Sequence, residues 1–78
     1  MYYVYSIKCS NGFYIGCTSN IVNRINRHQK GDVFSTAYRL PIKLEFYIAI
    51  EDRQTAYKFE KYLKSGSGRA FIKKHLAK

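Results

Sequence analysis

Five side chains combine residue types that can bind a phosphate, hold a metal ion and move a proton: Tyr5, Tyr14, Arg24, His28 and Glu60. An arginine offers a phosphate a planar, permanently charged fork of donors. A carboxylate can hold one Mg²⁺, which often uses only one or two protein carboxylates and keeps its waters. A tyrosine can move a proton where nearby cations or a metal lower its pKa. Together these residue types would suit hydrolysis of a phosphate ester, provided that the fold gathers them.

Each of the five also has an ordinary structural interpretation. Strand tyrosines commonly pack in the core with the hydroxyl hydrogen-bonded, and a lone helical histidine is usually structural or solvated. Arg24 could be a solvated helix base, which is the commonest state of an arginine. Glu60 could pair with Lys64 four residues later, which is worth roughly a few tenths of a kcal/mol. Residue types alone leave both interpretations open.

Asn11-Gly12 predicts a β-hairpin between strands at residues 2–8 and 13–17. Both turn residues tolerate a positive φ, and both flanking runs are rich in aromatic or β-branched residues. A bulge or a three-residue loop would change the register of the hairpin. A two-residue loop would oppose Ser10 with Phe13, Cys9 with Tyr14, and Ile7 with Gly16.

The alternation of side chains predicts which hairpin residues share a face of the sheet. Tyr5 and Tyr14 lie on one surface with Gly16, whose missing side chain leaves room for a group to approach the backbone. The full set on that face is Tyr3, Tyr5, Ile7, Tyr14, Gly16 and Thr18.

A helix is expected over about residues 20–30, after the capping residues Thr18 to Asn20 and before Gly31. Arg24 and His28 are four residues apart, so they lie on the same side of this helix. The following segment, residues 31–43, has poor periodicity and is expected to be mostly loop.

A third strand is expected over residues 44–50, and a second helix over about residues 53–64, capped by Asp52. Glu60 lies at the border of the buried stripe of this helix. A last helix is expected over about residues 69–76, with Ser67 as a candidate cap. The apolar side chains expected on one face of the third strand are Leu44, Phe46, Ile48 and Ile50; those of the second helix are Ala56, Phe59 and Leu63.

These elements predict an α/β (α+β) fold with a small, predominantly antiparallel three-stranded sheet flanked by helices. The length of 78 residues and the lack of a long linker indicate one domain over residues 1–78.

The order of these residues resembles the GIY-YIG nuclease superfamily. Tyr3-Val4-Tyr5 stands where the family has its GIY triad, and Tyr14-Ile15-Gly16 matches the YIG triad. Arg24 follows eight residues after the glycine, and His28 and Glu60 complete the ordered set. Within the superfamily the small stand-alone single-domain proteins look closest. The N-terminal nuclease domain of the bacterial excision-repair endonuclease is a more distant comparison.

The resemblance implies a metal-dependent endonuclease that hydrolyses phosphodiester bonds in DNA, in repair or recombination. It implies one Mg²⁺ or Mn²⁺ on Glu60 and Arg24 on the scissile phosphate. Tyr5 and Tyr14 would be the general base or the residue that positions water, without an assignment between them, and His28 could assist the proton transfer. The products would carry a 5′-phosphate and a 3′-hydroxyl.

The formal charge of +9, with 14 Lys and Arg against 5 Asp and Glu, favours a polyanionic partner. DNA, RNA and an anionic membrane surface are the candidates, and a nucleic-acid partner is preferred over a merely soluble basic protein, because the bases are spread through the fold rather than confined to a disordered tail. The loop at residues 31–43 interleaves aromatics with bases, a pattern suited to stacking and backbone contact, although its aromatics could equally pack as core. Candidate contact residues are Arg27, Tyr38, Arg39, Lys43, Arg69 and Lys73.

Two departures from the family pattern concern turnover rather than fold. Some family nucleases place a lysine directly after the YIG glycine, where this chain has Cys17. Many members carry a late asparagine, whereas no asparagine follows Asn26 here. Ser67, Arg69 and Lys73 are the candidates for that role.

Neither a membrane span nor a signal peptide is expected, and two cysteines are too few for a zinc site. A reduced, cytoplasmic setting fits. Without an appended targeting module, poor sequence specificity is expected, and DNA, including branched or damaged DNA, is the expected partner, with RNA and the oligomeric state left open. The alternatives are a catalytically weak nucleic-acid-binding module on this scaffold and an interaction domain for an acidic protein.

Overall fold

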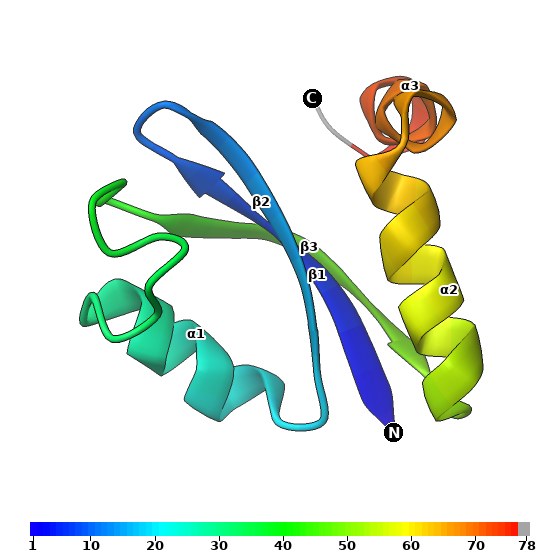
Figure 1. The fold of residues 1–78 in the computed structure, drawn as a ribbon, viewed down its shortest axis with the longest axis horizontal. Coiled ribbons are helices and arrows are strands. Elements are labelled where there is room, and N and C mark those ends of the chain that lie inside the picture. Colours follow the sequence, from blue (N-terminus) through cyan, green and yellow to red (C-terminus); the bar gives the residue numbers. More distant parts are fainter. Residues whose placement is uncertain (77–78) are drawn as a thin grey trace.

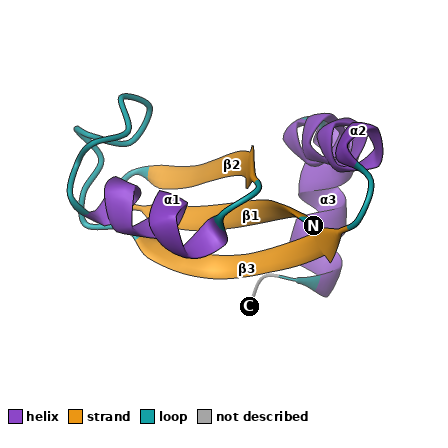
Figure 2. Cartoon of the chain, turned by 90° about the horizontal axis from the view of Figure 1, so that it is seen from below, coloured by secondary structure: helices purple, strands orange, loops and turns teal. Residues whose placement is uncertain are grey.

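The computed structural model describes residues 1–76 and folds them into a three-stranded sheet with three helices (Figure 1). All strand pairs are antiparallel, and β1 lies at the centre between β2 and β3 (Figure 2). The fold class expected from the sequence is therefore confirmed. The elements are β1 (Tyr2–Cys9), β2 (Gly12–Thr18), α1 (Ile21–Gln29), β3 (Lys43–Ile50), α2 (Arg53–Lys64) and α3 (Gly66–His75).

The sheet is covered on both faces, and each face has its own core. α1 and the loop after it lie against one face, where Tyr5 and Ile7 are buried (Figure 1). α2 and α3 pack against the other face, where Val4 meets Leu63. Because successive side chains of a strand alternate between faces, the central strand β1 is buried at five of its eight positions, on both faces of the sheet.

α1 and α2 begin at the caps that the sequence predicts. The Asn20 side-chain oxygen accepts a hydrogen bond from the Asn23 N–H at 3.0 Å. The Asp52 carboxylate accepts one from the Thr55 N–H at 2.8 Å. Each cap satisfies a backbone donor that has no partner inside the helix. Within residues 1–76, no helix is long and apolar enough to cross a membrane.

The predicted register of the hairpin is wrong by two residues. The turn lies at Ser10-Asn11, and Gly12 already pairs with Cys9 in the ladder, with a φ of +143° that favours glycine. Tyr5 therefore lies opposite Gly16, where the sequence had placed Ile7. A shift by an even number keeps every side chain on its predicted face, so the six residues expected together do share one face.

A contact distant in sequence accompanies this turn. Arg39, in the loop after α1, donates hydrogen bonds to the Asn11 side-chain oxygen at 2.7 Å and to the Phe13 carbonyl at 3.0 Å. The Ser10 N–H donates to the Arg39 carbonyl at 3.0 Å. The loop thus holds the hairpin tip, and the turn does not depend on local preference alone.

The predicted alternation along β3 is wrong at Leu44, because a β-bulge interrupts the strand. Ser6 pairs with Phe46, but Ile7 pairs with Leu44, so Glu45 is the extra residue. The bulge moves Leu44 to the face covered by α1, while Phe46 stays on the face covered by α2. The Glu45 carboxylate accepts a hydrogen bond from the Ser6 hydroxyl at 3.1 Å.

α3 begins three residues earlier than expected, and its cap is Ser65 rather than Ser67. The Ser65 hydroxyl accepts a hydrogen bond from the Gly68 N–H at 3.1 Å. Gly68 lies inside α3 and against the backbone of Leu63, where a Cβ atom would overlap α2. Gly68, one of the two glycines that suggested a helix break, therefore allows α2 and α3 to meet closely beside Ser65.

Candidate active site

Tyr5 is fully buried and lies against Gly16 on the neighbouring strand. A Cβ atom built on Gly16 would overlap the Tyr5 ring and hydroxyl. The sequence correctly indicated that this glycine makes room, but the group that fills the room is Tyr5 itself. The half-buried Tyr14 completes the pair, with its ring centroid 6.4 Å from that of Tyr5.

A chain of three buried polar side chains runs behind the tyrosines. The Tyr5 hydroxyl is 2.9 Å from His28 Nε2, and His28 Nδ1 is 2.7 Å from the Thr36 hydroxyl. All three residues are fully buried. This chain joins β1, α1 and the loop after α1, and it satisfies both nitrogens of the imidazole.

Burial, followed by the charges of Arg24 and Arg27, lowers the pKa of His28 to about 4. The imidazole is therefore neutral at physiological pH, with one nitrogen as donor and the other as acceptor. The tautomer that it adopts sets the direction of both hydrogen bonds.

Burial raises the pKa of Tyr5 to about 12, with Tyr14 adding to the effect and the Arg24 guanidinium opposing it. Because an arginine has only donors, the nearby Arg24 guanidinium favours a Tyr5 oxygen that accepts on that side and an O–H that turns to His28 Nε2. We therefore assign the remaining imidazole proton to Nδ1, from which it is donated to the Thr36 hydroxyl. Tyr5 is a neutral hydroxyl held in one orientation.

Glu60, on α2, faces the same centre from across the sheet edge. Its charge contributes to the raised pKa of Tyr5 and of Cys17, so its carboxylate lies within electrostatic reach of both side chains. Its Oε2 is 3.0 Å from the Lys64 ammonium, and the side chain is 20% exposed. Glu60 thus forms the ion pair with Lys64 that the sequence offered as one interpretation, and its charge also reaches Tyr5 and Cys17.

The donor set fits one weakly held, hard cation. Residues 1–76 contain no group of three His, Cys, Asp or Glu side chains that could cage a metal. Glu60 is one accessible carboxylate, which suits an ion such as Mg²⁺ that keeps most of its waters. An exposed i,i+4 ion pair is worth only about 0.3–0.5 kcal/mol, so Lys64 does not bar a divalent ion from Glu60.

Arg24 lines a small polar hollow of about 330 Å³, which Glu60 does not line. The hollow is shared with Arg53 of α2, whose guanidinium lies 5.3 Å from the centroid of the Tyr57 ring. Burial, followed by the charge of Glu60, raises the pKa of Cys17, which Arg24 opposes. Cys17 is thus a neutral thiol within electrostatic reach of both the acid and the arginine. The lining residues are Tyr2, Cys17, Thr18, Ser19, Arg24, Arg53 and Tyr57.

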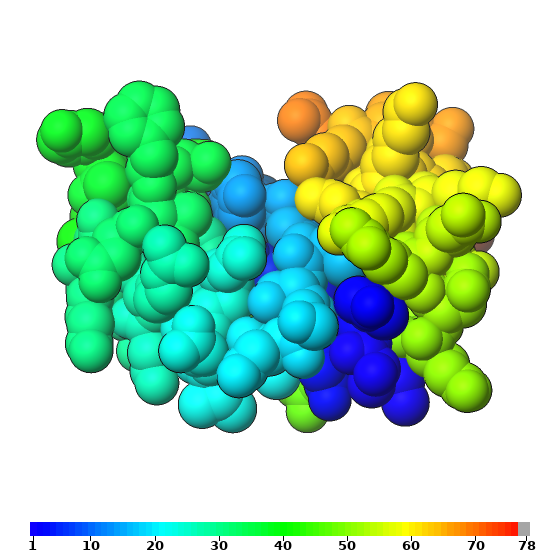
Figure 3. All heavy atoms as spheres, turned by 60° about the horizontal axis from the view of Figure 1, so that its bottom comes forward, coloured from blue at the N-terminus to red at the C-terminus, as the bar shows by residue number. Residues whose placement is uncertain are grey.

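The five residues predicted to carry the chemistry therefore come together. The residues predicted to contact nucleic acid lie on two sides of the molecule. Tyr38 is 91% exposed on the loop after α1, and Arg27 is exposed on α1. Arg39 has its guanidinium hydrogen-bonded to the hairpin tip, and Lys43 begins β3. Arg69 and Lys73 are exposed on α3. In Figure 3 the loop (green) and α2–α3 (yellow to orange) rise on either side of the hairpin.

Thr36 is the residue of the site that the sequence did not reveal. It lies in a segment without periodicity, and a threonine in a loop is usually exposed. Turn hydrogen bonds hold the backbone around it, including one from its N–H to the Val33 carbonyl at 3.0 Å. Its position eight residues after a helical histidine was the only available signal, and that spacing has no meaning without the loop conformation.

The sheet, the paired tyrosines and the Arg–His–Glu set define a class of nuclease-type domain. The family model of the GIY-YIG catalytic domain matches residues 1–75, and the chain belongs to this family. Members of the family are generally endonucleases that act on nucleic acid and typically use a divalent metal.

Its relatives are small UPF0213 proteins. One from Streptococcus agalactiae serotype V is 35% identical over 79 residues, covering 94% of this chain and 89% of the relative. One from Bacillus cereus is 39% identical over 62 residues, covering 77% and 65%. The solution NMR structure of a UPF0213 protein from Bacillus halodurans is similar with a TM-score of 0.59 and 28% identity, covering 95% of this chain and 84% of that one.

Proposed function

We propose that residues 1–78 form one endonuclease domain that hydrolyses phosphodiester bonds in DNA with the help of a single Mg²⁺ or Mn²⁺. Strand breaks with a 5′-phosphate and a 3′-hydroxyl are the expected product, and a role in repair or recombination follows from that chemistry. The observation that supports this function best is the convergence of Tyr5, Tyr14, Arg24, His28 and Glu60 from four elements on one edge of the sheet.

The buried chain behind Tyr5 explains how a neutral tyrosine could serve this reaction. Its O–H donates to His28 Nε2, so the oxygen has lone pairs directed away from the imidazole. Because Tyr5 has no exposed surface in the free protein, the attacking water would have to enter beside it when substrate binds, where it would donate to that oxygen and be aligned by it. The water would pass its proton to the Tyr5 oxygen while Tyr5 passes its own proton to His28 Nε2, so that the attacking oxygen becomes hydroxide and His28 becomes protonated. A bound phosphate would raise the pKa of His28, because its negative charge counters Arg24 and Arg27.

Arg24 and Glu60 would stabilise different charges in the reaction. The permanent charge of Arg24 would stabilise the negative charge that grows on the non-bridging oxygens of the phosphate. Glu60 would hold the divalent ion, which supplies Lewis-acid stabilisation of the phosphate and the leaving oxygen when bound. Tyr14, half-buried beside His28 with ring centroids 5.3 Å apart, would close the site on the side of the nucleophile.

The decisive experiment compares Glu60→Gln with Glu51→Gln in a cleavage assay on labelled single-stranded, duplex and flap DNA with Mg²⁺ or Mn²⁺. Glu51 is an exposed acid at the end of β3, outside the site, so its replacement is the matched control. We expect Glu60→Gln to lower cleavage by at least about a hundredfold, because the ion loses its only charged ligand. Glu51→Gln should cleave like the original chain, and EDTA should abolish cleavage.

Binding, measured on the same substrates, separates this function from its alternatives. Glu60→Gln should keep its DNA affinity within a few-fold, since Glu60 repels rather than attracts phosphate in the absence of metal. Metal-dependent cleavage that survives Glu60→Gln would refute the assignment of Glu60. Salt-dependent binding without cleavage on any substrate would instead indicate a binding module on a nuclease fold.

A further inference from the structure

We propose that the hollow between the hairpin and α2–α3 binds an unpaired nucleotide, so that the preferred substrate is single-stranded beside the cleaved bond. This inference rests on the function proposed above and specifies its substrate. The hollow has a volume of about 830 Å³ and is separate from the small polar hollow of Arg24. The residues of its wall that matter here are Phe13, Tyr14, Ile15, Arg69, Ile72 and Lys73.

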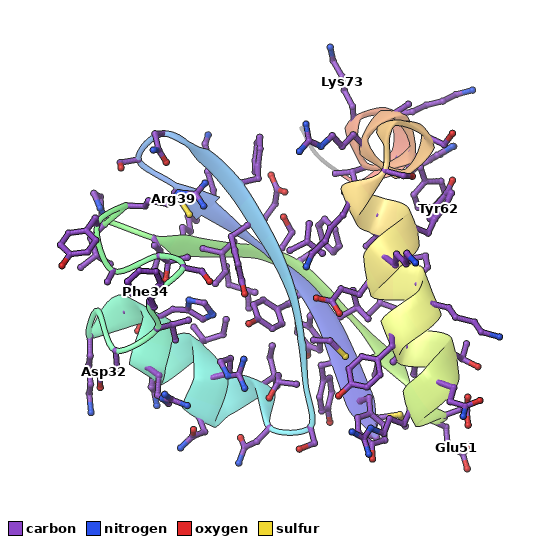
Figure 4. The ribbon with its side chains drawn as sticks, in the orientation of Figure 1. Asp32, Phe34, Arg39, Glu51, Tyr62 and Lys73 are labelled. Atoms are coloured by element: carbon purple, nitrogen blue, oxygen red, sulfur yellow. The ribbon has the colours of Figure 1, made fainter. Side chains whose placement is uncertain are left out.

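The chemistry of the hollow matches a nucleotide in both of its parts. The floor is mostly apolar, with Ile15 from the hairpin and Ile72 from α3. Arg69 and Lys73 contribute two positive charges, and no acidic residue lines the wall. Lys73 extends outward from α3 at the rim (Figure 4). A base is apolar on its two faces and carries an anionic phosphate, so it can use the floor and the rim together.

Phe13 is the residue that favours an unpaired base over a duplex backbone. It is 54% exposed on β2, an unusual position for a phenylalanine that could pack inward. An exposed aromatic ring offers a stacking surface, which any unpaired base can use because every base has a π-face. In a duplex the faces of the bases are covered by their neighbours, so the backbone could use the charges but not the ring.

The hollow lies next to the candidate active site. Lys64 lines it, and the ammonium of Lys64 is 3.0 Å from the Glu60 carboxylate. Tyr14 also lines the hollow, and in the candidate active site its ring lies beside those of Tyr5 and His28. Arg24 and its polar hollow lie at the other end of α2. A strand with its scissile phosphate between Arg24 and Glu60 would therefore place a neighbouring nucleotide at Phe13.

A second exposed aromatic surface provides the comparison. Phe34 is 88% exposed and Tyr38 is 91% exposed, both on the loop after α1. Neither residue lines the hollow or shares a wall with Glu60 or Arg24. Phe34→Ala is thus the matched control for Phe13→Ala, because it removes the same side chain from another exposed site.

The test measures binding of a labelled single strand and of its duplex by fluorescence anisotropy, with all variants made in a Glu60→Gln background. Phe13→Ala should weaken single-strand binding about tenfold and leave duplex binding unchanged, as expected for the loss of one stacked base. Phe13→Tyr and Phe34→Ala should both keep the original affinity. A 2-aminopurine base in the strand should lose fluorescence on binding, and Phe13→Ala should restore it.

The outcomes separate this site from the proposed function. Equal losses on single strand and duplex, no loss on either, or a loss reproduced by Phe34→Ala would overturn the nucleotide site. Phe13→Tyr keeps the test valid if Phe13→Ala fails to fold, because loss of affinity with a stacking ring still present would also contradict the proposal. Cleavage does not enter these measurements, so failure of the Glu60 experiment and failure of this one are distinct results.

Discussion

The two faces of the central strand β1 carry cores of opposite character. On the face covered by α2 and α3, Val4, Ala56 and Leu63 form a buried aliphatic cluster. On the face covered by α1, the fully buried side chains include the hydrogen-bonded Tyr5, His28 and Thr36. Both cores are formed around one strand whose residues alternate between them.

The difference shows how so small a domain can combine stability with chemistry. The aliphatic cluster gains free energy from apolar burial, and its three side chains carry no polar atom that needs a partner. The polar core depends on complete hydrogen bonding, because each unpaired buried group costs about 1–3 kcal/mol. In return it holds the Tyr5 hydroxyl in a defined orientation. The two cores should therefore respond differently to substitution and to pH.

The largest effect on stability is expected from Leu63→Ala on the aliphatic side. Removing a fully buried leucine side chain should lower the free energy of unfolding by roughly 3 kcal/mol, through lost burial and the cavity left behind. The loss, measured by urea unfolding, should be the same at pH 7.5 and pH 5, since no titrating group is involved. The matched control is Leu40→Ala at a 40% exposed position, which should cost well under half as much. A pH-dependent loss in Leu63→Ala would contradict the proposed division between the cores.

The polar side should make stability depend on pH through His28. Its pKa is about 4 in the folded chain against 6.5 for an unperturbed histidine, so the unfolded chain binds the proton more readily between these values. The contribution to stability is therefore fully present above pH 6.5 and is lost as the pH falls towards 4. Between pH 7.5 and pH 5 the free energy of unfolding should fall by about 2 kcal/mol.

The chain carries a matched histidine for this test, because His75 on α3 is exposed and His28 is buried. Urea unfolding from pH 7.5 to pH 5 should show the full decrease in His75→Gln and a much flatter profile in His28→Gln. An unchanged pH dependence in His28→Gln would assign the decrease to the carboxylates and remove His28 from the explanation.

The smallest effect on the free energy of unfolding is expected at Thr36. It tests the comparison between the two cores most directly. Thr36→Val keeps the shape of the side chain but removes the hydroxyl that meets His28 Nδ1 at 2.7 Å, which should cost about 1–2 kcal/mol. It should also slow cleavage, because the tautomer of His28 is no longer held. Thr36→Ser restores the hydroxyl and should recover the cleavage rate even if some stability stays lost. Equal cleavage by the valine and serine variants would show that Thr36 has only a packing role.

Several features follow from local sequence preference and could be predicted from it. The caps Asn20 and Asp52 work through side-chain oxygens within three residues, so their partners are always near. The shared face of Tyr5 and Tyr14 follows from the two-residue period of strands, which survives an error of two in register. The buried positions Ala56 and Leu63 follow from the period of a helix.

The remaining features depended on contacts between distant parts of the chain. The turn at Ser10-Asn11 is held by Arg39, which no local rule connects to it. Glu45 forms a bulge opposite Ser6 and sends Leu44 to the other face, although the strand pattern alone favours regular alternation.

The residues proposed to carry the chemistry also depend partly on local sequence and partly on tertiary contacts. Their types and order were sufficient to nominate Tyr5, Arg24 and Glu60, because these side chains suit phosphate chemistry wherever they lie. Only the tertiary structure joined Thr36 to His28 and His28 to Tyr5 in one buried chain. Local preferences act over a few residues, whereas a buried hydrogen bond exists only where packing from several elements excludes water and brings both partners within about 3 Å.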